Sequence, residues 1–281
     1  MIRSLVSAGV AGLASYAATR AVMSSRLRRQ EKVLRTNHSG REVSLVEGPA
    51  LAAGLLAGSV LIEDPRQRGA TLLATAVAGG LGGVDDFLES GSSKGLRGHL
   101  GALARGEITT GALKVIGIPV ASVAAAAILG SGQDPRDARF PALTAAVDTV
   151  VAGGVIAGTA NLFNLLDLRP GRALKAGFLT LALMEHDHGT SWVPAAGIAG
   201  SSAGAWTEDL AGETMLGDTG ANALGAALGT MLAAGSGPRH RAAILAVLVA
   251  LTLLSEKVSF TSVIEATPGL RELDAFGREH V

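Results

Sequence analysis

Residues 108–129 read ITTGALKVIGIPVASVAAAAIL, an apolar stretch that carries one charged residue, Lys114. A helix that crosses the hydrocarbon core of a bilayer needs about 20 mainly apolar residues. The stretch is long enough for that, and Lys114 lies within or at the edge of the expected span. It therefore predicts a membrane-spanning helix, and similar apolar blocks recur along the rest of the chain.

Nine such blocks, separated by charged residues, predict an all-α polytopic integral membrane protein with about nine transmembrane helices. The whole chain, residues 1–281, is expected to form a single membrane-embedded domain, with 255–281 as a cytoplasmic or interfacial C-terminal segment. Some blocks are shorter than about 20 residues, so their ends are expected to reach into flanking polar residues. The blocks are 5–23, 49–62, 70–84, 108–129, 143–160, 173–184, 192–206, 221–234 and 242–254.

The composition supports this class of protein. Of 281 residues, 48% are hydrophobic and 17% are charged, against roughly 25% charged in a soluble domain. This apolar content excludes a disordered chain, the absence of cysteine excludes a disulfide scaffold, and a net charge of zero gives no basic field for nucleic acid. Glycines are abundant, and the spacings Gly154–Gly158 and Gly225–Gly229 predict close helix packing.

Lysine and arginine are unevenly divided between the two sets of loops. The loops that follow the odd-numbered blocks hold roughly twice as many as the other set, and basic loops remain in the cytoplasm. The N-terminus is therefore expected outside and the C-terminus inside. Four polar segments, 35–41, 83–99, 161–172 and 217–222, then all lie on the cytoplasmic face.

These segments carry residues suited to a divalent cation and phosphate. An isolated carboxylate at the end of a membrane helix is energetically unfavourable. Mg²⁺ binds one or two carboxylates together with substrate phosphates. Lysine and arginine can neutralise phosphate oxygens. Taken alone, an Asp-Asp pair is more often a solvated helix end. The carboxylates are Asp85, Asp86, Asp167 and Asp218, and the cations are Lys94, Arg97, Arg169 and Arg172.

In their order along the chain, the segments resemble the polyprenyl-phosphate sugar-1-phosphate transferase superfamily, whose members include MraY, WecA and TagO. The resemblance covers roughly residues 35–274. It rests on five short patterns, each weak alone: Arg35-x-Asn37-x-x-Gly40, Gly83-Val-Asp85-Asp86, Lys94-Gly95-Leu96, Asn161-x-x-Asn164-x-x-Asp167 and Gly217-Asp218-x-Gly220.

The resemblance implies transfer of a sugar-1-phosphate from a UDP-activated amino sugar to a polyprenyl phosphate, with release of UMP, in bacterial cell-envelope glycan synthesis. It places a multi-pass enzyme in the cytoplasmic membrane, with a homodimer as a family-level expectation. Mg²⁺, or alternatively Mn²⁺, is the implied cofactor, held by Asp218 and Asp85. Asp85, Asp86 and Asp167 are the implied catalytic residues. Which of the adjacent pair is the base stays open, because such carboxylates titrate together.

The expected substrate-binding residues come from all the polar segments except the last. His99 is included, although a loop histidine bonded to backbone or water is the simpler alternative. The third segment departs from the family: many relatives have Asp-Gly-x-Asp-Gly, whereas this chain reads Asp167-Leu-Arg-Pro-Gly-Arg172, with Pro170 in place of the second aspartate and two additional arginines. This replacement leaves the identity of the sugar donor open and is compatible with a more anionic donor. The residues are Arg35, Asn37, Lys94, Arg97, His99, Asn161, Asn164, Arg169 and Arg172.

Two other functions remain open at this point. A non-catalytic paralogue that binds lipid phosphate or scaffolds other enzymes would explain the altered third segment, but not the retained Asp85, Asp86 and Asp218. A transporter would place charges in mid-span or break helices in repeated halves, whereas these carboxylates gather at one face.

Overall fold

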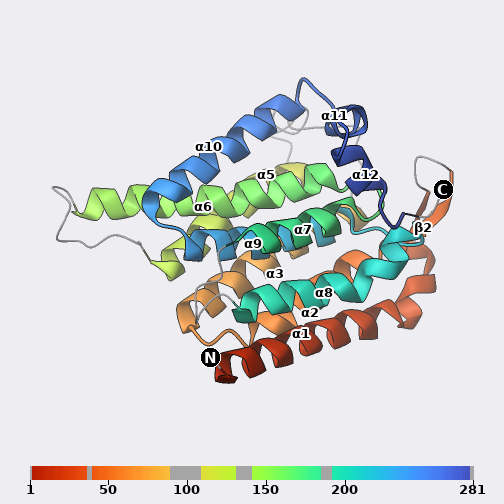
Figure 1. The fold of residues 1–281 in the computed structure, drawn as a ribbon, viewed down its shortest axis with the longest axis horizontal. Coiled ribbons are helices and arrows are strands. Elements are labelled where there is room, and N and C mark those ends of the chain that lie inside the picture. The colour runs from red at the N-terminus through yellow and green to blue at the C-terminus, as the bar shows by residue number, and fades with distance from the viewer. Residues whose placement is uncertain (1, 37–39, 89–108, 131–140, 185–191, 279–281) are drawn as a thin grey trace.

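The computed structural model describes residues 2–36, 40–88, 109–130, 141–184 and 192–278. Long helices dominate these residues, and Figure 1 shows them lying side by side with their axes roughly aligned. The long helices are α1 (Ile2–Met23), α2 (Glu47–Ser59), α3 (Pro65–Leu88), α5 (Thr110–Leu129), α6 (Pro141–Leu166), α7 (Arg172–Leu183), α8 (Trp192–Leu210), α9 (Gly217–Gly235) and α10 (Pro238–Ser255). Two short helices, α11 (Phe260–Ala266) and α12 (Leu270–Ala275), follow α10.

A helix occupies each of the nine predicted positions in the described part of the chain. Five are long and apolar enough to cross a membrane, which agrees with an all-α membrane protein. The four others are α2 and α7, with 13 and 12 residues, and α8 and α9. A span needs about 20 residues, so α2 and α7 are too short as they stand. The five are Ile2–Arg29, Pro65–Leu88, Thr110–Leu129, Pro141–Leu166 and Pro238–Ser255.

A small β-hairpin, which the all-α prediction missed, follows α1. Its strands β1 (Leu34–Thr36) and β2 (Glu42–Ser44) are antiparallel. Ser44 extends the pairing to the turn before α9: its N–H donates to the Glu213 carbonyl at 3.1 Å and its carbonyl accepts from the Met215 N–H at 3.0 Å. The hairpin, which contains part of the first polar segment, is thereby hydrogen-bonded to the turn that leads into the fourth.

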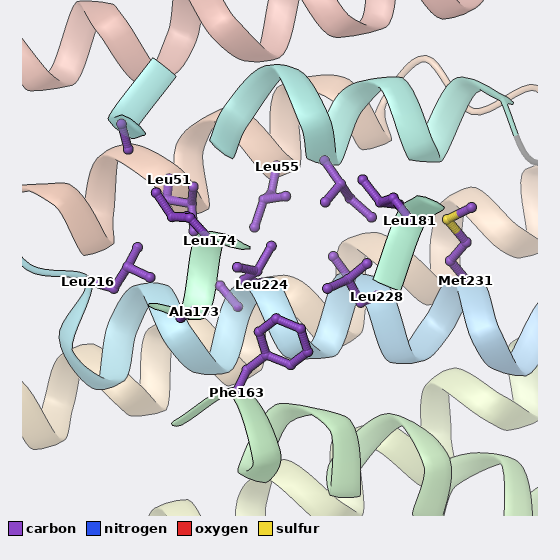
Figure 2. Packing of buried hydrophobic residues seen from close by; sticks show 14 of the residues in the cluster. Leu51, Leu55, Phe163, Ala173, Leu174, Leu181, Leu216, Leu224, Leu228 and Met231 are labelled. Carbon is purple, nitrogen blue, oxygen red and sulfur yellow. The ribbon is translucent and has the colours of Figure 1, made fainter. Parts of the chain in front are cut away.

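Helix α9 is the central helix of the bundle, and most of its residues are buried. It packs against α2, α3 and α6. Figure 2 shows leucines of α9 meeting apolar side chains from its neighbours, among them Phe163 of α6. Because most residues of α9 are buried, its side chains pack mainly against other helices of the bundle.

Glycines of α9 form a tight seam, as the small-residue spacing predicted. A Cβ placed on Gly225 would lie 2.6 Å from the Cα of Ala160, and one on Gly229 would lie 2.8 Å from the Cα of Ile156. Such distances to backbone atoms leave no room for a side chain. The prediction that Gly225 and Gly229 are packing positions is therefore confirmed, and their partner is α6.

The second predicted glycine pair also lies in a seam. A Cβ on Gly154 would lie 3.0 Å from the side chain of Leu245, and one on Gly158 would lie 3.2 Å from that of Leu248. Here leucine side chains of α10 fill the space over α6. This seam holds α10 at the edge of the bundle, where only a small share of its residues is buried.

The bundle has two ends. We call the end that holds the hairpin the polar end, and the opposite end, near Ser7 and Glu63, the far end. At the polar end, Arg28 and Glu213 form an ion pair beside the hairpin. At the far end, Ser7 Oγ donates to Glu63 Oε1 at 3.0 Å. The described parts of all four polar segments lie at the polar end, which is the grouping that the alternating helix directions predict.

Candidate active site

Three helices bring charged side chains together at the polar end. Lys114, in the second turn of α5, donates from Nζ to Asp85 Oδ2 of α3 at 2.8 Å. The same ammonium group forms an ion pair with Asp218 at the start of α9. The side chain of Asp85 is 9% exposed and that of Asp218 is 25% exposed. The cluster is thus half-buried and opens toward solvent at Asp218.

Asp86 has a different environment from its neighbour. Its Oδ1 accepts from the Asp218 N–H at 3.0 Å, and its Oδ2 accepts from the Thr219 N–H at 2.8 Å and from Thr219 Oγ1 at 2.6 Å. The first N–H groups of a helix have no partner within the helix, and a carboxylate there also interacts favourably with the helix dipole. Asp86 therefore caps α9 from another helix.

Glycines permit this close approach of α3 and α9. Gly217 has a positive φ of 58°, and a Cβ at that position would lie 3.0 Å from both carboxylate oxygens of Asp86. A Cβ on Gly82 would lie 2.2 Å from the Asp218 carbonyl oxygen. The N–H groups of Asp218 and Thr219 at this helix start donate to Asp86, so they are not available to bind a phosphate.

Arg35 comes from the first polar segment and reaches the same place. Its Nη2 donates to the carbonyl of Asp86 at 2.8 Å, and its guanidinium lies 6.0 Å from the ring centroid of Phe87. The hairpin positions Arg35 because β1 pairs with β2, which is itself tied to the turn before α9. The structure thus joins Arg35 to the aspartate pair.

Asp167 follows the last turn of α6 at the same end. Burial raises the pKa of its carboxyl group well above the ordinary value, and the nearby charges of Asp209, Asp218 and Asp86 raise it further. A carboxyl group with a raised pKa holds its proton at a pH at which an ordinary aspartate is ionised, and raised pKa values are common among catalytic acids and bases.

The raised pKa predicts how stability depends on pH. An unfolded aspartate ionises near pH 3.9, whereas the folded protein retains the Asp167 proton to higher pH. The parent protein therefore loses stability as the pH rises from about 4 toward the folded pKa. The Asp167→Asn variant cannot ionise, so we expect its thermal midpoint to exceed the parent's by an amount that grows over this range. Midpoints of both proteins between pH 4 and 8 test this; a constant difference would contradict it.

Three of the four remaining predicted residues of the third segment have structural partners. Arg172 is buried and pairs with Asp274 of α12, while Arg169 is exposed and donates to Glu265 Oε1 at 3.3 Å. Further back on α6, Asn161 Nδ2 donates to Thr252 Oγ1 of α10 at 3.1 Å. Asn164 is half-buried on the last turns of α6.

Four of the expected site residues lie outside the described part of the chain. They are Asn37, Lys94, Arg97 and His99.

Two residues at this end were not assigned a role from the sequence. Lys114 is a single charge in an otherwise apolar helix, and an ionisable residue within a membrane segment is a reason to expect function. Asp209 of α8 is buried and accepts from the Gly171 N–H at 3.1 Å. It gave no such signal, because it lies near a helix end beside Glu208 and resembles an ordinary polar terminus.

The aspartates at the polar end fit a divalent cation that is shared with a substrate. In the described part of the chain, no group of three or more histidine or acidic side chains is arranged to hold a metal ion. Asp85 and Asp218 nevertheless share one cationic partner, and Oδ1 of Asp85 is buried with no hydrogen-bond partner among the described residues. Two carboxylates suffice for Mg²⁺ when phosphates supply further ligands.

No protein-family model and no curated protein matches this chain.

Proposed function

We propose that the protein is a membrane-embedded transferase that moves a sugar-1-phosphate from a UDP-activated amino sugar to a polyprenyl phosphate. The observation that carries the proposal is the cluster of Asp85, Lys114 and Asp218, assembled from three helices. Arg35 and Asp167 lie at the same end. This combination of carboxylates and cations suits a reaction between two phosphate-bearing substrates.

In this reaction, an oxygen of the lipid phosphate attacks the phosphorus that carries the sugar. The bond from that phosphorus to the bridging oxygen breaks, and UMP leaves with the electron pair. Asp85 and Asp218 would hold Mg²⁺, which when bound would neutralise charge on the pyrophosphate. Lys114 and Arg35 attract the anionic substrates to the site. Asp86 keeps the start of α9, and with it Asp218, in position.

The membrane setting is part of the proposal. All nine long helices serve as spans, the short ones completed by flanking polar residues, with the N-terminus outside and the C-terminus in the cytoplasm of a bacterium. The polar end then faces the cytoplasm, where nucleotide sugars are made. The lipid substrate enters from the inner leaflet of the cytoplasmic membrane. A homodimer is the proposed assembly.

The direct test is transfer of radiolabel from a panel of UDP-sugars to undecaprenyl phosphate by purified protein in detergent with Mg²⁺. We expect labelled lipid to form, and to be lost with EDTA or in the Asp218→Asn variant. The matched control is Glu63→Gln, an exposed carboxylate at the far end, which should transfer at the parent rate. If the control also lost transfer, the loss in Asp218→Asn could not be assigned to the site.

One observation favours a second candidate, the non-catalytic lipid-phosphate-binding or scaffolding protein. Lys114 already compensates part of the charge of Asp85 and Asp218 within the protein, so the cluster is stable without a cation. If folded protein binds undecaprenyl phosphate but transfers no label from any UDP-sugar, the binding protein is the better interpretation.

A further inference from the structure

The C-terminal helices α11 and α12 are attached to the third polar segment by one buried ion pair. Arg172 Nε donates to Asp274 Oδ1 at 2.7 Å, and Nη2 donates to Oδ2 at 3.1 Å. The side chains are 4% and 8% exposed. A bidentate ion pair of this kind fixes the orientation of the two side chains as well as the distance between them.

Further contacts extend the pair to both short helices. The third nitrogen of Arg172, Nη1, donates to Thr261 Oγ1 of α11 at 2.9 Å, and Lys175 Nζ donates to the Asp274 carbonyl at 2.5 Å. Arg278 Nη2 donates to Asp274 Oδ2 at 2.8 Å. Helices of seven and six residues are not stable alone, so these contacts hold them in place.

Among the described residues, Asp274 is the carboxylate that pairs with both Arg172 and Arg278. Burial acts to raise its pKa, but the hydrogen bonds and charges of the two arginines outweigh burial, so the pKa lies below its ordinary value. Asp274 is therefore ionised at neutral pH. Replacing it would leave buried arginine charge without its partner, which is strongly unfavourable.

Segment 167–172 is also held by contacts with α8. Gly171 has a positive φ of 74°, and its N–H donates to the buried Asp209 Oδ2. A Cβ on Gly171 would lie 2.3 Å from the Leu210 side chain. Arg278, which follows α12, also contacts this segment: its Nε donates to the Pro170 carbonyl at 3.3 Å. The path of the chain just after Asp167 is thus set between α8 and the C-terminal helices.

We propose that Asp274 is a positioning residue: through Arg172 it clamps α11–α12 onto segment 167–172 and so fixes Asp167 for the reaction. The functional part of this inference rests on the proposed transferase activity. The clamp itself does not, and it can be tested without substrate. In this assignment the two arginines that distinguish segment 167–172 serve the C-terminal helices, and Arg172 does not contact the donor.

The test uses the full-length protein in detergent, with Asp274→Asn, Arg172→Gln, the double variant and the control Glu265→Gln. Glu265 is an exposed acid of α11 that pairs with Arg169 of the same segment, and exposed pairs contribute little. The first measurement is amide hydrogen exchange. We expect exchange in 167–172 and 260–276 to become at least about tenfold faster in Asp274→Asn, and to be unchanged in Glu265→Gln. Unchanged exchange in Asp274→Asn would overturn the clamp.

The second measurement separates positioning from substrate contact. We expect Asp274→Asn to lower kcat about tenfold or more, with the KM for both substrates unchanged and the double variant no worse than the worse single variant. Asp274→Glu, which keeps the charge, should restore part of kcat. A raised donor KM in Arg172→Gln, with normal exchange, would show that Arg172 contacts the donor and would overturn the proposal.

Two further arms keep the result decisive. If Asp274→Asn does not fold, Thr261→Val removes one contact of the clamp, and faster exchange confined to α11, α12 and 167–172 is the expected result; exchange as in the parent would overturn it. If the parent transfers no label at all, the proposed function fails while the exchange measurement still decides whether the clamp exists.

Discussion

Replacing Asp85 with asparagine is expected to lower transfer at least about 100-fold while the thermal midpoint stays close to that of the parent. Asp85 faces Lys114 and Asp218, and one of its oxygens is buried without a hydrogen-bond partner in the described part of the chain. Neutralising it removes an ion pair but also removes repulsion with Asp218, so the two effects on stability oppose each other. The measurements are label transfer and thermal unfolding in the same detergent.

The matched variant is Asp86→Asn, one residue further along α3. Both oxygens of Asp86 accept hydrogen bonds from α9, and an asparagine would turn an N–H toward an N–H donor. Leaving partly buried donors unsatisfied costs about 1–2 kcal/mol, so this variant should lose both transfer and several degrees in its midpoint. Equal midpoints for the two variants would contradict the division of roles between the adjacent aspartates.

Breaking the ion pair between Asp148 and Arg241 at the far end is expected to destabilise the protein by about 3–5 kcal/mol. Arg241 Nη1 donates to Asp148 Oδ2 at 2.6 Å, both side chains are buried, and Nε donates to the Ala233 carbonyl at 2.8 Å. The variant Asp148→Leu leaves the guanidinium buried without its counter-charge. Thermal and denaturant unfolding should both show the loss.

The double variant Asp148→Leu, Arg241→Met is the control for this pair. It removes both charges and keeps the apolar volume, and such replacements are often neutral or stabilising. We expect it to recover most of the lost stability and to transfer label at the parent rate, because the pair lies at the end of the bundle away from Asp218. A double variant less stable than Asp148→Leu would show that the pair itself, rather than the unpaired charge, matters.

The positions of the nine long helices followed from the sequence alone. A long apolar run must satisfy its own backbone hydrogen bonds in a bilayer, and a helix does this locally. The boundaries were less well predicted: α6 continues to Leu166, six residues past the predicted end of its apolar block, so Asn161 and Asn164 lie on the helix. The paired strands 34–36 and 42–44 were missed because they have three residues each, too few for a pattern.

The sequence also predicted which polar segments lie at one end, because alternating helices return the chain to the same end after every second helix. It could not assign roles within them. Asp85 and Asp86 are neighbours in sequence, yet successive residues of a helix point about 100° apart. One consequently meets Lys114 and the other caps α9.

The sequence by itself thus determined the helical architecture and the polar end, since both depend on local hydropathy and on chain direction. Only the tertiary structure decided that Lys114 joins Asp85 to Asp218, and that Arg172 binds Asp274. The physical reason is that a charged side chain takes its partner from whichever helix packs beside it. Residues 172 and 274 are far apart in the chain, and no local pattern records their contact.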